Sequence, residues 1–273
     1  MKLMSIFGTR PEIIRLSKIF PLLDSNFDHV MVNTYQNYTT ELNKIFFKEL
    51  GIRSPDYNLG VATKNYGDEI SDVIKKSEKV LLKEKPDMIL ILGDTNSGLA
   101  AIPASHHGIK IAHLEAGMRS YDYRMPEEKN RIIIDHLSSI LLPYTQYSRE
   151  NLIRENIHPS KIFVVGNPII EVINSHIKKI DSSKILDKLK IKPNEYFLVT
   201  AHRSENVDDP DSLKQILEGL KKIHSKFGKK IIYPIHPRTV DKLKGTKIPK
   251  GITTTKPLGF IDFCKLEKNA LCM

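Results

Sequence analysis

Residues 115–131 carry a high density of side chains that can move protons or bind anions. They include four carboxylates and three arginines: Glu115, Asp122, Glu127, Glu128, Arg119, Arg124 and Arg131. Proton transfer at carbon needs acid and base groups with separated pKa values, and neighbouring carboxylates can provide them. Glu127 and Arg131 stand four positions apart, so a helix places both on one face. The segment therefore predicts acid–base chemistry beside a cation.

Two other segments offer similar side chains directly after apolar runs. Gly8-Thr9-Arg10-Pro11-Glu12 suits a tight turn into a helix whose amino terminus attracts an anion. We expect Arg10 to hold a phosphate or carboxylate there. In Gly93-Asp94-Thr95, either Asp94 or Thr95 caps the next helix, or the Asp94 carboxylate faces a ligand. This segment alone leaves both interpretations open.

The second half of the chain has two equivalent loops that pair an imidazole with a guanidinium. His202-Arg203 and His236-Pro237-Arg238 each follow an apolar run. Such a pair suits an anionic diphosphate, because both side chains donate hydrogen bonds and can carry positive charge. We therefore expect His202, His236 and Arg238 to contact an anionic ligand.

Several common catalytic signatures do not occur. There is no Walker phosphate loop, no Gly-x-Gly-x-x-Gly, no His-Glu-x-x-His and no Gly-x-Ser-x-Gly. ATP hydrolysis, nicotinamide redox chemistry, zinc hydrolysis and serine esterase chemistry therefore lose their usual support. The two cysteines, Cys264 and Cys272, are too few for a zinc site and are expected to be buried apolar residues.

The elements that must position these side chains follow from apolar periodicity. Short apolar runs alternate with amphipathic stretches, the pattern of parallel strands joined by helices in a doubly wound α/β fold. The predicted strands are 2–7, 29–33, 88–92, 110–113, 140–143, 161–165, 196–200 and 230–234. The predicted helices are 12–23, 40–50, 68–84, 97–106, 128–137, 148–155, 169–179, 211–227, 239–243 and 260–269. Ligands of such sheets bind beyond the carboxyl ends of the strands, where the polar loops lie.

A domain boundary is predicted near Gly166-Asn167-Pro168 in this chain of 273 residues. It separates an N-terminal Rossmann-like domain, 1–168, from a C-terminal one, 169–273. The first contains six of the predicted strands and the second only two. Residues 270–273 have the composition of another buried strand. We therefore expect the second domain to be incomplete, or to be completed by a partner.

Composition limits the classes of partner. The net charge of +10 comes largely from dispersed lysine pairs at helical spacing, and no zinc-finger or aromatic-and-basic RNA-binding motif accompanies it. No stretch approaches the ~20 apolar residues that span a bilayer, and the first residues lack a signal-peptide core. We expect no nucleic-acid partner, no membrane partner and a cytoplasmic location.

The ordered motifs closely resemble those of the non-hydrolysing UDP-N-acetylglucosamine 2-epimerase family. The motifs are Gly8-Thr9-Arg10-Pro11-Glu12, Gly93-Asp94-Thr95, His113-Leu114-Glu115-Ala116-Gly117-Met118-Arg119, Pro126-Glu127-Glu128 with Asn130-Arg131, and His202-Arg203-Ser204-Glu205-Asn206. The segments Glu12-Ile13-Ile14-Arg15-Leu16, Asn37-Tyr38 with Glu41-Leu42-Asn43, and His236-Pro237-Arg238-Thr239 look more like one branch of that family. That branch makes UDP-N-acetyl-L-fucosamine by C2 epimerisation of a 6-deoxy-talosamine nucleotide.

The resemblance implies two Rossmann-like domains of the glycosyltransferase-B type with the active site between them. It also implies a homodimer that needs no metal or redox cofactor. In the family, a base removes the C2 proton while UDP leaves C1, and a 2-acetamidoglycal intermediate stays bound. UDP adds back after a proton returns to the opposite face. The implied reaction interconverts UDP-N-acetylglucosamine and UDP-N-acetylmannosamine for a bacterial surface polysaccharide, such as capsule or O-antigen.

Residue roles carry over by motif. Asp94, Glu115 and Glu127 match the acid–base carboxylates of the family, and His202 matches its catalytic histidine. The substrate-binding positions are Arg10, Arg15, Arg131, His236 and Arg238. Arg10 matches a phosphate-contacting arginine and Arg131 a second arginine of the cleft. Arg15 stands where many relatives carry lysine.

Three alternatives remain beside this interpretation. In the family, the segment that binds the UDP diphosphate comes later than residue 273, so an inactive truncated remnant is one alternative. A sugar transferase on the same fold is another, although the carboxylates of residues 115–131 favour elimination. A hydrolysing 2-epimerase is a third, and nothing in the chain suggests the fused kinase domain that would accompany it.

Overall fold

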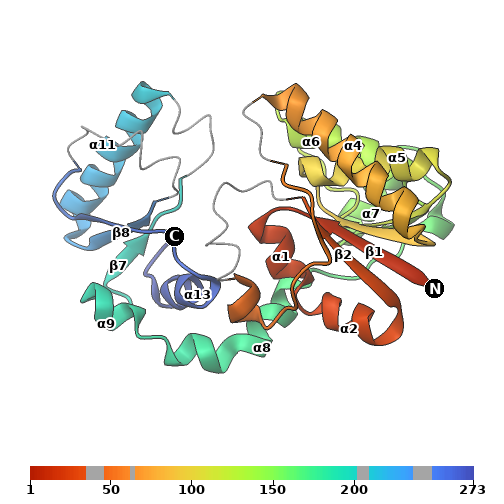
Figure 1. Cartoon of the computed structure of the whole chain (residues 1–273). Helices are drawn as coiled ribbons and strands as arrows, with labels where there is room; N and C mark the ends of the chain where they lie inside the picture. The colour runs from red at the N-terminus through yellow and green to blue at the C-terminus, as the bar shows by residue number, and fades with distance from the viewer. Residues whose placement is uncertain (35–45, 62–64, 202–208, 236–247) are drawn as a thin grey trace. The chain divides into compact units, whose positions relative to one another are not determined.

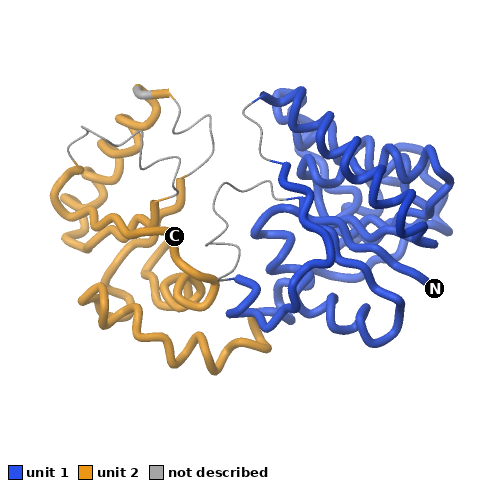
Figure 2. The backbone as a smooth tube through the Cα atoms, viewed as in Figure 1, with its two compact units in different colours: residues 1–172 blue, residues 173–273 orange. Residues whose placement is uncertain are grey.

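The computed structural model describes residues 1–34, 46–61, 65–201, 209–235 and 248–273 (Figure 1). The chain forms two compact units, Met1–Val172 and Ile173–Met273, which Figure 2 colours separately. The division falls inside helix α8 (Ile169–Ser182). Each unit has its own parallel sheet with helices connecting the strands. This confirms the predicted α/β class with Rossmann-like units.

The sheet of unit 1 has six parallel strands in the order β3-β2-β1-β4-β5-β6. Their bounds are β1 (Lys2–Phe7), β2 (Asp28–Asn33), β3 (Tyr57–Asn58), β4 (Met88–Leu92), β5 (Lys110–Leu114) and β6 (Ile140–Leu142). This is the strand order of the Rossmann fold, in which the direction of winding reverses between β1 and β4. Ligands of such sheets bind at the carboxyl ends of the strands next to that reversal.

Helices cover both faces of this sheet (Figure 1). Helices α1 (Arg10–Leu16) and α2 (Ile19–Asn26) lie on one face, where the rings of Phe7 and Phe20 are 5.1 Å apart. On the other face lie α4 (Tyr66–Glu84), η1 (Asn96–Ala100), α5 (Ala101–His106) and α6 (Pro126–Leu137). Helix α7 (Gln146–Arg154) packs against β6 through Leu152 and Leu141.

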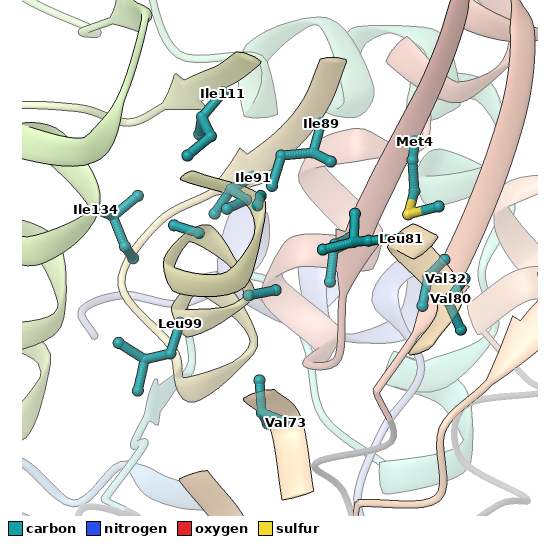
Figure 3. Packing of buried hydrophobic residues seen from close by; sticks show 14 of the residues in the cluster. Met4, Val32, Val73, Val80, Leu81, Ile89, Ile91, Leu99, Ile111 and Ile134 are labelled. Carbon is teal, nitrogen blue, oxygen red and sulfur yellow. The ribbon is translucent and has the colours of Figure 1, made fainter. Parts of the chain in front are cut away.

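The main core of unit 1 lies between the sheet and α4, η1, α5 and α6 (Figure 3). Alternate positions of each strand point to this side, since side chains alternate along a strand. The buried residues that the figure labels are Met4, Val32, Val73, Val80, Leu81, Ile89, Ile91, Leu99, Ile111 and Ile134. This packing fixes the strand ends from which the polar loops project.

The sheet of unit 2 has the order β7-β8-β9, all parallel. The strands are β7 (Tyr196–Leu198), β8 (Lys230–Pro234) and β9 (Ile252–Thr255). Helix α11 (Pro210–Phe227) packs on one side of the sheet. Helices α9 (Ile185–Leu189) and α13 (Phe260–Asn269) pack with a second group of buried residues from β7 and β8.

Several predicted elements differ from those observed. The predicted helix 12–23 is two helices, because Pro21 has no N–H to donate to the Ser17 carbonyl. Residues 161–165 form only a bridge, Leu141 to Ile162, rather than a full strand. The short strands β3 and β9 and helix α9 were not predicted. Predicted helix 239–243 and residues 40–45 lie outside the described residues.

The last residues and the cysteines also require correction. The Leu271 amide donates to the Tyr196 carbonyl at 2.9 Å, and the Leu198 amide donates to the Cys272 carbonyl at 3.0 Å. Residues 271–272 therefore pair with β7 as a strand does, but their side chains are exposed rather than buried. Cys264 is buried as expected, whereas Cys272 is exposed, and both thiols are free.

Candidate active site

Five of the predicted site residues lie on elements that meet at the carboxyl edge of the unit 1 sheet. They are Arg10, Arg15, Asp94, Glu115 and Arg131. The first two belong to α1, which follows β1, and the next two follow β4 and β5 directly. Arg131 reaches the same edge from α6. The Rossmann strand order explains this convergence, because parallel strands end at one edge.

Glu115 forms an ion pair with Arg15, in which the Arg15 Nη1 donates to the Glu115 Oε2. The two side chains are 17% and 21% exposed, respectively. The Glu115 backbone has φ of 73°, which turns the chain sharply after β5. Burial raises the pKa of the Glu115 carboxyl and outweighs the opposite effect of Arg15. A buried carboxylate with a raised pKa is suited to removing a proton near neutral pH.

Asp94 pairs with Arg131. Both Nε, at 3.0 Å, and Nη2 of Arg131 donate to the Asp94 Oδ2. The Arg131 Nη1 donates to the Glu128 Oε2 at 2.8 Å, and the Asn130 side chain donates to the Asp94 carbonyl at 3.0 Å. Thr95, not Asp94, stands at the N-cap of η1. The carboxylate of Asp94 is therefore held by α6 rather than used to cap a helix.

Glu12 joins the loops that follow β1 and β4, a role that the sequence did not predict. Its buried carboxylate accepts hydrogen bonds from the Gly8 amide at 3.0 Å, the Thr9 amide at 2.6 Å and the Thr95 hydroxyl at 2.9 Å. Burial raises the pKa of Glu12, although these hydrogen bonds oppose the shift. The Thr9-x-x-Glu12 spacing is a capping-box pattern, and this pattern is the feature of the sequence that indicates a structural role for Glu12.

A second unpredicted network lies beneath the loop after β5. The Asp135 carboxylate bonds the His113 Nδ1 at 2.7 Å, the Gly117 amide at 3.1 Å and the Arg119 Nη1 at 2.8 Å. The His113 Nε2 donates to the Gly93 carbonyl at 2.9 Å. Burial alone would raise the pKa of Asp135, but His113 and Arg119 hold it below its usual value. The network links the loops that carry Asp94 and Glu115.

Arg10 is half-buried at the start of α1, and its guanidinium lies 5.9 Å from the centre of the Phe46 ring. Burial lowers the pKa of Arg10. Within the described part of the chain, no carboxylate or carbonyl accepts a hydrogen bond from this guanidinium. Its donors are therefore available to an anion from outside the chain.

The structure does not bring Glu127 into the networks described above. Glu127 is exposed at the start of α6, whereas the next residue, Glu128, is buried. Glu128 accepts hydrogen bonds from the Ser120 and Tyr121 amides at 3.0 and 2.9 Å. The difference arises because neighbouring helical residues point about 100° apart around the axis. His202, His236 and Arg238 lie outside the described residues.

The described ranges contain neither a metal-binding cluster nor a membrane-spanning helix. No group of three or more His, Cys, Asp or Glu side chains there could hold a metal ion. No described helix is long and apolar enough to cross a membrane.

Comparison with known proteins identifies the family. The sequence model of the family described as UDP-N-acetylglucosamine 2-epimerase matches residues 23–273. The chain belongs to this family. The UDP-N-acetylglucosamine 2-epimerase of Methanocaldococcus jannaschii is 44% identical over 281 aligned residues, which cover 99% of this chain and 77% of that protein. The resemblance inferred from the ordered motifs is thus confirmed.

Solved structures of the epimerase family share the fold. The crystal structure of the M. jannaschii enzyme in complex with UDP-GlcNAc and UDP matches with a TM-score of 0.92 at 43% identity. The match covers 99% of this chain and 77% of that one. The Rickettsia bellii enzyme matches with a TM-score of 0.92 at 41% identity, over 100% of this chain and 73% of the other. Family members are isomerases of nucleotide sugars, as the motifs implied.

Proposed function

We propose that this chain interconverts UDP-N-acetylglucosamine and UDP-N-acetylmannosamine by inverting C2 of the sugar. The partly buried Glu115 carboxylate carries the proposal, because it lies beside a cation at the carboxyl end of β5 in a chain of this family. Relatives of that name at 44% and 42% identity support the choice of substrate. The solved complex of the M. jannaschii enzyme with UDP-GlcNAc and UDP supports it further.

The reaction requires a group that removes a proton from carbon. In our proposal, Glu115 or Asp94 takes the C2 proton, and a second acid–base group returns one to the other face of the sugar. Glu115 suits the first role because burial raises the pKa of its carboxyl. Glu127 and His202 are the other proposed acid–base groups. Two faces of one carbon require groups on both sides of it, so more than one titratable residue is needed.

The reaction also requires cations, because UDP departs with its diphosphate as the C2 proton is lost. Arg10 is the best placed of the described cations, since no described carboxylate holds its guanidinium. Arg15 and Arg131 already bond carboxylates, so a diphosphate must compete for them. We propose that His236 and Arg238 contribute from the second unit. Elimination and re-addition then proceed with UDP retained.

Proton NMR of UDP-GlcNAc incubated with the full chain tests this function. The expected result is the appearance of the anomeric signal of UDP-ManNAc, and the reverse conversion from UDP-ManNAc. Glu115→Gln removes the proposed base but preserves the shape of the side chain, so its turnover should fall by about 10²- to 10⁴-fold. Glu150→Gln, an exposed change on α7, is the matched control. A folded wild-type chain that converts neither sugar would overturn the proposal.

The substrate is the point on which relatives differ. A UDP-2,3-diacetamido-2,3-dideoxy-D-glucuronate 2-epimerase from Pseudomonas aeruginosa is 34% identical over 96% of this chain. The same assay should therefore include that sugar nucleotide and the 6-deoxy-talosamine nucleotide of the fucosamine branch. We expect the highest kcat/KM for UDP-GlcNAc. A higher value for either of the others would retain the epimerase chemistry and reassign the substrate.

We also propose that units 1 and 2 correspond to the two Rossmann-like domains of the family, with a boundary near residue 168. We further propose that the chain acts as a homodimer in the cytoplasm and supplies a surface polysaccharide. The free Cys264 and Cys272 thiols support a reducing compartment. Light scattering on the purified protein tests the dimer, and a monomeric mass at micromolar concentration would refute it.

A further inference from the structure

Tyr144 lies at the same sheet edge as the proposed acid–base residues. It is the second residue after β6, the strand next to β5. The Glu115 amide donates to the Leu142 carbonyl at 3.1 Å, so the turn that carries Glu115 is fixed to the end of β6. Tyr144 and Glu115 therefore follow two adjacent parallel strands. None of the motifs discussed above includes Tyr144.

The Tyr144 hydroxyl is a buried polar group that interacts with Arg15 but forms no hydrogen bond of good geometry within the described part of the chain. The residue is 8% exposed, and its Oη has no hydrogen-bond partner of good geometry among the described residues. The hydroxyl lies beside the Arg15 guanidinium and close to the Glu115 carboxylate. Buried hydroxyls in folded proteins nearly always form a hydrogen bond of good geometry, so one that does not, at a ligand site, points to a working state with a different arrangement.

Movement of Arg15 away from Glu115 would make the Glu115 carboxylate available as an acceptor for the Tyr144 hydroxyl. Among described residues, the Arg15 guanidinium is the only side chain that donates a hydrogen bond to the Glu115 carboxylate. A bound diphosphate carries more negative charge than one carboxylate and competes for the same donors. When Arg15 turns to the diphosphate, Glu115 loses its donor in a buried position. The Tyr144 phenol, which interacts with both Arg15 and Glu115, is then available as a neutral donor.

We propose that Tyr144 is a positioning residue of the site, whose hydroxyl becomes the hydrogen-bond donor to Glu115 when bound diphosphate engages Arg15. The inference rests on the proposed function, because it assumes a diphosphate substrate and Glu115 as a base. Tyr144 itself touches no reacting atom in this account. It keeps the Glu115 carboxylate oriented and ionised after its ion pair with Arg15 is broken.

The charged groups around Glu115 determine how its pKa should change when the Tyr144 hydroxyl is removed. Arg15 from α1 and His113 from β5 lower the pKa of Glu115, while burial and Asp94 from the β4 loop raise it. Tyr144 remains a neutral donor near neutral pH, because burial raises its pKa to about 12. When Arg15 binds the diphosphate, the phenolic donor is one of the remaining groups that lower the pKa of Glu115. Its loss therefore increases the net effect of burial and Asp94, which raise that pKa. The pKa of Glu115 should then rise in the ligand-bound protein.

The test compares Tyr144→Phe with the wild-type full chain in two measurements. The first is the pH dependence of kcat, which should show its acid limb displaced upward by about 0.5–1 pH unit. The second is a ¹³C NMR titration of carboxyl-labelled glutamate, with the Glu115 signal assigned by its loss in Glu115→Gln. In the presence of saturating UDP, the pKa of Glu115 should be higher in Tyr144→Phe than in wild type by the same amount. Without UDP, the difference in this pKa should be small.

Tyr57→Phe is the matched control, because the Tyr57 hydroxyl donates to Glu84 far along the strands from this edge. This control should change neither the pH dependence of kcat nor the NMR titration of Glu115. Identical Glu115 titrations in wild type and Tyr144→Phe with UDP bound would overturn the inference. The NMR titration needs no turnover, so failure of the proposed epimerase function remains distinguishable from failure of this inference. The removed hydroxyl forms no hydrogen bond of good geometry within the described part of the chain, so the variant should melt at the wild-type temperature.

Discussion

Arg15 and Glu115 are one hundred positions apart in the sequence and form an ion pair at the carboxyl edge of one sheet. The pair connects the helix after β1 to the end of β5, although β4 lies between those strands. Gly93, at the end of β4, leaves the space, because a Cβ there would lie 3.0 Å from the Glu115 Oε2. The ion pair therefore passes over the end of β4 and links α1 to the end of β5.

Glu127 and Glu128 are expected to differ in role despite being neighbours. Glu127→Gln should lower kcat by about 10²- to 10⁴-fold and leave the unfolding free energy unchanged, because Glu127 is exposed and proposed to be an acid–base group. Glu128→Gln should lower the unfolding free energy by about 1–3 kcal/mol, because it removes an acceptor from buried donors. Urea unfolding and steady-state kinetics on both variants measure the contrast. Equal effects of the two changes on kcat and on stability would contradict it.

Asp135→Asn should destabilise unit 1 strongly. The Asp135 and Arg119 side chains are at most 1% exposed, and the change removes one of the two negative charges that face Arg119, the other being Glu155. We expect the unfolding free energy to fall by about 3 kcal/mol. Asp122→Asn is the control, because Asp122 pairs with the exposed Arg124 and its loss should not change the unfolding free energy measurably. Similar unfolding curves for Asp135→Asn and wild type would refute a stabilising role.

The same carboxylate makes stability depend on acid pH. His113 and Arg119 hold the pKa of Asp135 below its usual value. A depressed pKa means that the unfolded state binds the proton more readily, so this contribution is present above about pH 4 and is lost as pH falls through the folded pKa. Wild-type stability should therefore fall more steeply than that of Asp135→Asn as the pH falls below about 4. Parallel slopes in urea unfolding would show that Asp135 is not the titrating group.

Gly117 and Gly108 offer a matched test of close packing after β5. Both have positive φ, 74° and 71°, but a Cβ on Gly117 would lie 2.2 Å from the Ser148 carbonyl oxygen, whereas one on Gly108 would meet nothing within 4 Å. Gly108→Ala should cost about 1 kcal/mol from its backbone alone. Gly117→Ala should cost a further ~1–3 kcal/mol from overpacking. Equal melting temperatures for the two variants would disprove the close contact.

The sequence was a good guide to the fold because burial and periodicity act locally. Strands β1, β4 and β8 have the predicted limits, since each is a nearly continuous apolar run within a buried sheet. Strand β3 has only two residues and no apolar run, so nothing in its composition distinguishes it from a loop. The break between α1 and α2 was available from Pro21 and was missed.

The site was predicted less completely, because the residues that hold its functional side chains in place are brought to them by tertiary contacts. Arg10, Asp94 and Glu115 follow strand ends, and Arg15 and Arg131 lie on the helices that come after β1 and β5, so topology alone brings these five residues to one edge. The partners that hold them do not follow from spacing. Asp135 contacts His113 across 22 positions, and Glu12 contacts Thr95 across 83. Such pairings become visible only once the strand order is known.

Exchange at C2 in deuterium oxide tests the central claim most directly, since it follows the proton that Glu115 is proposed to remove. The full chain is incubated with UDP-GlcNAc in D₂O, and the C2 position of both epimers is followed by NMR and mass spectrometry. We predict UDP-ManNAc that carries deuterium at C2, and formation of this product about 10²- to 10⁴-fold slower with Glu115→Gln. UDP-ManNAc that retains the original proton, or full C2 exchange by Glu115→Gln, would contradict the account.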